Sequence, residues 1–71
     1  MKEYVMLGFR KTNGINIDSF KDTFNEDFEE RFKRQIKYYQ SLELLYKKEN
    51  NYYLSDKGLD VSNKIISDFI Y

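Results

Sequence analysis

The sequence predicts a mainly α-helical domain with one small β-hairpin, arranged as a winged-helix-like fold of three helices, a two-stranded wing and a C-terminal helix. Apolar residues recur at helical spacing in several stretches, and a polar triplet separates two short runs of aromatic and aliphatic residues. The length of 71 residues suits one domain over positions 1–71, near the lower size limit for an independent core.

The first expected helix covers residues 4–9, which are apolar almost all round. Such a helix must be packed against other parts of the protein on more than one side. We therefore expect an exposed or loosely packed apolar patch at Tyr4 and Val5 in the isolated domain, with Arg10 at its edge. A breaker cluster follows, in which Gly14 suits a positive φ.

Two further helices are expected in the middle of the chain. Asp18 is a good N-cap for a short helix over residues 19–24, and Asn25 for a longer helix over residues 26–42. We interpret the aromatic stripe on these helices as core, because a small fold needs large rings to bury enough area. The alternative is a stacking platform for a porphyrin or for bases. The stripe recurs every four residues, at Phe20, Phe24, Phe28, Phe32 and Ile36.

The hairpin and a last helix complete the expected fold. Residues 44–48 and 52–54 are strand candidates joined by the polar triplet 49–51. Ser55 is expected to cap a helix over residues 56–70, and Gly58 in its first turn indicates close packing, because glycine lowers helix propensity. The expected inward face of this helix comprises Leu59, Ser62, Ile66 and Phe69 or Ile70.

Composition excludes several kinds of site. The chain has no Cys and no His, so disulfides, thiolate or imidazole metal sites and histidine acid–base catalysis are excluded, and we expect no metal site. Twelve basic residues balance twelve acidic ones, so the chain has no bulk attraction to nucleic acid. No apolar run reaches the length of a membrane span, and no signal peptide is evident, so the expected location is the cytoplasm.

Charged residues leave two interpretations open. Arg10, at a helix end, either complements the helix dipole or binds an anion, such as a substrate propionate or a group on a partner domain. The basic residues of the recognition helix and wing either contact phosphates or belong to a mixed-charge solvated surface, and we favour the second. They are Lys33, Arg34, Lys37, Lys47, Lys48 and Lys57. No carboxylates form a convincing catalytic pair, and the glycines form no phosphate loop.

Several short segments occur in the order found in one protein family. An apolar run leads to Gly8-Phe9-Arg10 and then Gly14-Ile15, and later motifs are Leu44-Leu45, Leu54-Ser55 with Gly58, and Ser62-Asn63. The chain thus resembles the C-terminal domain of the oxygen-independent coproporphyrinogen III oxidases and their heme-chaperone relatives, which are radical S-adenosylmethionine proteins. The resemblance spans essentially the whole chain. Phe9 stands where the family usually has Leu, and Asn25 and Glu43 stand where Gly is common.

The resemblance implies that residues 1–71 are the C-terminal part of a longer protein of porphyrin or heme metabolism. Its upstream barrel would hold a [4Fe–4S] cluster and S-adenosylmethionine, and this domain would cover the barrel mouth and help to form the substrate pocket. The partners implied are that barrel and a porphyrin or heme, with no nucleic acid and no membrane. The expected substrate or interdomain contacts are Arg10, Tyr4 and Val5, and the expected structural motif residues are Gly8, Gly14, Gly58 and Asn63.

No catalysis is expected from the isolated chain, which lacks the cluster ligands and can only contribute to an oxidoreductase as one of its parts. The competing function is a small winged-helix DNA-binding regulator or a protein-interaction module. Salt-dependent DNA binding would favour the regulator, and a barrel encoded directly upstream would favour the accessory domain.

Overall fold

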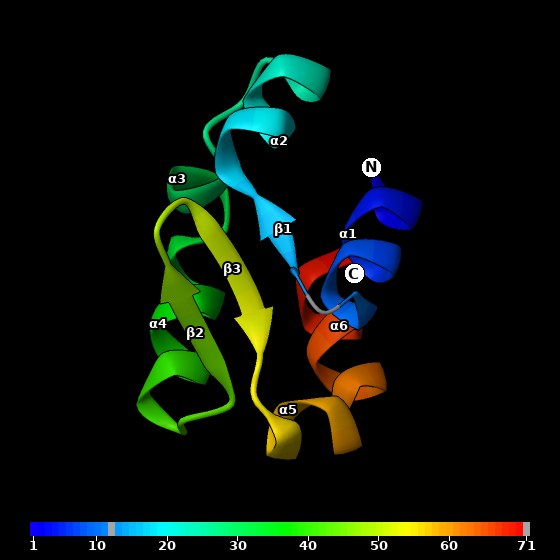
Figure 1. Cartoon of the computed structure of the whole chain (residues 1–71), viewed down its shortest axis with the longest axis vertical. Helices are drawn as coiled ribbons and strands as arrows, with labels where there is room; N and C mark the ends of the chain where they lie inside the picture. Colours follow the sequence, from blue (N-terminus) through cyan, green and yellow to red (C-terminus); the bar gives the residue numbers. More distant parts are fainter. Residues whose placement is uncertain (12, 71) are drawn as a thin grey trace.

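The computed structural model describes residues 1–11 and 13–70. Within them, short helices surround a small antiparallel sheet, with the first and last helices, α1 and α6, lying side by side (Figure 1). The elements are α1 (Lys2–Arg10), β1 (Ile15–Asn16), α2 (Ile17–Phe24), α3 (Phe28–Arg31), α4 (Lys33–Ser41), β2 (Leu45–Lys48), β3 (Asn51–Leu54), α5 (Asp56–Asp60) and α6 (Ser62–Ile70). The mainly helical fold class with a small hairpin is confirmed. No helix in the described part is long and apolar enough to cross a membrane.

The sheet has three strands in the order β1-β3-β2, where the sequence predicted two. The hairpin itself is confirmed, with Leu45 opposite Leu54 and Lys48 opposite Asn51. The additional strand β1 has only two residues, and it pairs with β3 on the side away from β2. Two residues are too few to show a strand periodicity, which explains why the two-stranded wing was an incomplete prediction.

The capping residues of the middle helices differ from those expected. Asn16, not Asp18, caps α2, because its side-chain oxygen accepts a 2.9 Å hydrogen bond from the backbone N–H of Ser19. Asn25 ends α2 in the left-handed conformation, with φ 55°, instead of starting the next helix. Asp27 takes that role for α3. The caps are therefore shifted by two residues in each case.

Each of the two longer helices expected from the sequence is interrupted. The helix predicted over residues 26–42 divides at Phe32 into α3 and α4, and the helix predicted over 56–70 divides at Val61 into α5 and α6. Apolar residues spaced by four drift round a straight helix, so a break allows both halves to face the core. The second break leaves Leu59 exposed, contrary to expectation, and Ile65 is buried beside Ile66 and Phe69.

The core is a cluster of aromatic rings centred on Phe28, which is fully buried. The predicted burial of Phe28, Phe32 and Ile36 is confirmed, and the stripe is therefore core. The Phe28 ring centroid lies 5.0 Å from that of Phe32 and 6.2 Å from that of Phe69 on α6. Its other ring contacts are with Phe9, Phe20 and Tyr52.

Ser55 and Gly58 form the start of α5 as the sequence predicted. The Ser55 hydroxyl accepts a 3.0 Å hydrogen bond from the backbone N–H of Gly58. A Cβ at Gly58 would lie 2.3 Å from the carbonyl oxygen of Leu44, so only glycine fits against the entry to the hairpin. The close packing inferred from this glycine is thus confirmed.

Candidate interdomain surface

Arg10, predicted as a substrate or interdomain contact, lies in direct contact with Asn63, predicted as a structural motif residue. The Arg10 guanidinium donates a hydrogen bond to the Asn63 side-chain oxygen, with 2.6 Å between Nη2 and Oδ1. This bond connects the last turn of α1 to the first turn of α6 across 53 residues of sequence. Arg10 is exposed, and its charge also lies at the carboxyl end of α1, where a cation complements the helix dipole.

Two adjoining hollows lie beside α1, and we call them together the α1 groove. The smaller, of about 170 Å³, is lined by Tyr4, Leu7, Gly8, Lys11, Gly14 and Ile15. The larger, of about 340 Å³, is lined by Arg10, Lys11, Tyr53, Leu54, Asp56 and Leu59. Lys11 lines both. The groove therefore combines side chains of α1, β3 and α5 with the segment that follows α1.

The apolar patch predicted at Tyr4 and Val5 is wrong for Val5, which is fully buried. Tyr4 is half-buried, with its ring packed edge-on against Phe24 at 5.3 Å between centroids. The exposed apolar residue of α1 is Leu7, which is 54% exposed. Leu7 is about 200° round the helix from Val5, so the outward face of α1 is on the side opposite to the predicted one.

Gly8 and Gly14 allow α1 to approach the sheet. A Cβ at Gly8 would lie 2.4 Å from Cγ1 of Ile15 on β1. Gly14 has the positive φ expected from the sequence, at 70°. Both glycines line the smaller hollow.

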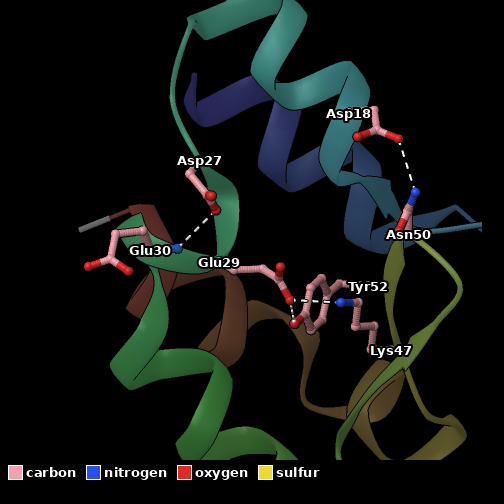
Figure 2. Close-up of polar contacts among 7 residues, drawn as sticks. All are labelled: Asp18, Asp27, Glu29, Glu30, Lys47, Asn50 and Tyr52. Atoms are coloured by element: carbon pink, nitrogen blue, oxygen red, sulfur yellow. Dashed lines mark hydrogen bonds and ion pairs between the residues drawn. The ribbon is translucent and has the colours of Figure 1, made fainter.

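A polar cluster on the other side of the sheet joins α3 to the hairpin. Figure 2 shows one oxygen of the Glu29 carboxylate joined to both the Tyr52 hydroxyl and the Lys47 ammonium. Tyr52 donates to Glu29 at 2.5 Å, and Lys47 forms an ion pair with the same oxygen at 2.9 Å. These two hydrogen bonds lower the pKa of Glu29, whereas burial, followed by the bond to Glu29, raises the pKa of Tyr52. Lys47 is thus engaged within the domain.

This cluster predicts a specific pH dependence. Because the folded-state pKa of Glu29 is lowered, its stabilising contribution is present above the ordinary carboxylate pKa and is lost as pH falls through the lowered value. We expect Glu29→Gln to lose less stability than wild type between about pH 5 and pH 2. Urea denaturation across this range is the measurement, with Glu30→Gln as the exposed control. Identical pH profiles of wild type and Glu29→Gln would contradict the prediction.

Two side-chain amides fasten the hairpin loop to neighbouring elements. Asn50 donates to the Asp18 carboxylate at 3.1 Å, and Asp27 caps the backbone N–H of Glu30 nearby (Figure 2). Asn16 donates to Asn51 at 2.7 Å across β1 and β3. Asp18 thus holds the hairpin loop against α2, and Asp27 caps α3.

A hollow that the sequence did not indicate lies between α4 and α6, with a volume of about 490 Å³. Arg34 and Tyr38 line it, and the Tyr39 hydroxyl donates to the Asp68 carboxylate at its wall. Burial, then this hydrogen bond, raises the pKa of Tyr39. The donor and acceptor come from different helices, so only the folded structure reveals the pair. No group of three acidic, Cys or His side chains among the described residues is placed to hold a metal ion.

The geometry defines a small winged-helix-like domain with a groove of mixed apolar and cationic lining beside α1. The chain belongs to the HemN C-terminal domain family, whose model matches residues 1–61. It is 29% identical over 70 residues to the heme chaperone HemW of Lactococcus lactis subsp. lactis (strain IL1403). That alignment covers 99% of this chain and 18% of the relative. No solved structure matches the chain.

These comparisons confirm the family resemblance drawn from the sequence motifs. HemN-family proteins are radical S-adenosylmethionine proteins, and the chain is a domain of such a heme-related protein. The [4Fe–4S] cluster of such proteins is held by Cys thiolates, and this chain contains no Cys. The residues present therefore do not fit such a cluster.

Proposed function

We propose that this chain is the accessory C-terminal domain that covers the mouth of a radical S-adenosylmethionine barrel and helps to form its substrate pocket. The α1 groove is the observation that carries the proposal. It presents Leu7 and Leu59, both about half-exposed, next to Arg10 and Lys11. A surface that mixes apolar and cationic groups is suited to contact with another domain.

In this proposal, two parts of one polypeptide have different roles. The upstream barrel supplies the cluster and S-adenosylmethionine, and this domain supplies shape and charge at the barrel mouth. The similarity to a heme chaperone favours heme handling over oxidative decarboxylation of coproporphyrinogen III. Axial ligation of heme by His or Cys cannot come from this chain, which has neither residue.

The full-length open reading frame provides the test. We expect it to encode a barrel with a three-Cys motif before residue 1. Deleting the segment that corresponds to residues 1–71 should then leave the iron content of the barrel intact but weaken heme binding, measured by absorbance titration under anaerobic conditions. Unchanged heme affinity in the deletion variant, or a reading frame without a barrel, would contradict the proposal.

The winged-helix regulator remains the second candidate, because α4 presents Lys33, Arg34 and Lys37 on an exposed surface. The balanced charge of the chain and the engagement of Lys47 by Glu29 weigh against it. Fluorescence titration with duplex DNA at two salt concentrations separates the candidates. Micromolar, steeply salt-dependent binding would favour the regulator.

A further inference from the structure

We infer that the α1 groove receives an acidic, apolar segment of the upstream barrel, with apolar side chains against Leu7 and Leu59 and a carboxylate against Arg10 and Lys11. The inference rests on the proposed function and assigns the docking surface and the chemistry of its partner. It differs from the surface expected from the sequence, which was centred on Tyr4 and Val5.

Exposed apolar side chains are gathered around the α1 groove. Leu7 is 54% exposed and Leu59 is 45% exposed, and single exposed leucines are ordinary in proteins. These two, however, line adjoining hollows that share Lys11, and Tyr53 lies in the wall between α1 and α5. Exposed apolar side chains around a hollow offer a place where a partner's side chains can be buried.

The charge of the groove specifies the partner. Arg10 and Lys11 form no ion pair with any residue in the described ranges, whereas Lys47 is paired with Glu29. Asp56 is the one carboxylate lining the groove among the described residues. Arg10 gives one hydrogen bond to Asn63, and a guanidinium has five N–H donors, so it is held in position with donors left for a carboxylate.

Tethering favours the upstream barrel over a separate molecule as the occupant. The groove flanks α1, the first helix of the chain, and the barrel of the proposed parent precedes this helix in the same polypeptide. A segment linked in this way has a high effective concentration at the groove. An acidic segment also complements the two cations, whereas a nucleic acid would meet Asp56 and the apolar wall.

Photo-cross-linking of the full-length protein tests the inference directly. p-Benzoylphenylalanine is introduced separately at Leu7 and at Leu59, with Tyr38, 56% exposed on α4, as the matched control. We expect the two groove positions to cross-link within the same polypeptide to an upstream peptide that contains Asp or Glu, and Tyr38 not to do so. Cross-links from Tyr38 alone would overturn the groove assignment but leave the docking function standing. Cross-links to a second copy would overturn the choice of occupant.

A charge-reversal series provides an independent readout. Arg10→Glu with Lys11→Glu should reduce the cross-linked fraction from Leu7 roughly tenfold, because like charges across an interface are strongly unfavourable. The matched control is Arg34→Glu with Lys37→Glu on α4, and circular dichroism confirms that both variants fold. Restoring the cross-link by reversing the acidic residue found upstream would establish the pairing. An undiminished cross-link in the groove variant would overturn the carboxylate assignment while leaving the proposed function intact.

Discussion

Phe28→Ala is expected to unfold this domain at room temperature. Phe28 is fully buried, and its ring contacts those of Phe9, Phe20, Phe32, Tyr52 and Phe69. Truncating a buried Phe costs about 3–5 kcal/mol, from lost transfer free energy and the remaining cavity. The total stability of a small domain is commonly about 5 kcal/mol, so little or no stability would remain. Thermal and urea denaturation followed by circular dichroism measure the loss.

Phe24→Ala is the matched control for this prediction, because it removes the same atoms from a half-buried ring. Phe24 packs against Tyr4 and Phe20 at the edge of the cluster. Its truncation should cost clearly less than that of Phe28 and leave a folded domain. Equal losses of stability in the two variants would show that the cluster is not centred on Phe28.

Much of the fold could be predicted because the signals are local. The four-residue recurrence of Phe28, Phe32 and Ile36 requires only a helix with one buried face, and Ser55 followed by α5 is a local capping arrangement. The positive φ of Gly14 is also a property of the residue itself. Each of these features was found at the expected position.

The features that the sequence did not reveal depend on tertiary contacts. The strand β1 has two residues and forms only because β3 is present to pair with it. Asn16 and Asp18 are both good capping residues, and the contact of Asn16 with Asn51 favours the first. Local sequence does not distinguish two capping residues that are two positions apart, because the contact that favours Asn16 comes from the distant strand β3.

At the candidate site, too, some features follow from the sequence and others depend on tertiary contacts. Arg10 and Asn63 were identified from family motifs, yet their contact requires α1 and α6 to lie side by side (Figure 1). Helix α1 is apolar nearly all round, so its sequence does not show which face points outward. The exposed apolar residue is therefore Leu7, whereas the sequence predicted Val5. Leu59 lies in α5, before the break at Val61, where it is 45% exposed and lines the groove.

Gly14→Ala is the second substitution with a large expected effect. Gly14 has φ 70°, and an L-residue in the left-handed region costs about 1–2 kcal/mol. An added Cβ would also lie 2.0 Å from the carbonyl oxygen of Tyr52, a backbone atom that cannot move without disturbing β3. We therefore expect a total loss above about 2 kcal/mol, measured by urea denaturation.

Gly8→Ala is the matched control for Gly14→Ala and separates backbone strain from crowding. Its Cβ would lie 2.4 Å from Cγ1 of the buried Ile15 side chain, so crowding is present at both sites. Gly8, however, has no positive φ, and Ala in a helix gains up to about 1 kcal/mol over Gly. The loss at Gly8 should therefore be smaller. If both variants lose the same stability, the strain at Gly14 is not the controlling factor. If the predicted order holds, the left-handed conformation of Gly14, which lines the α1 groove, is the main reason why glycine is required at this position.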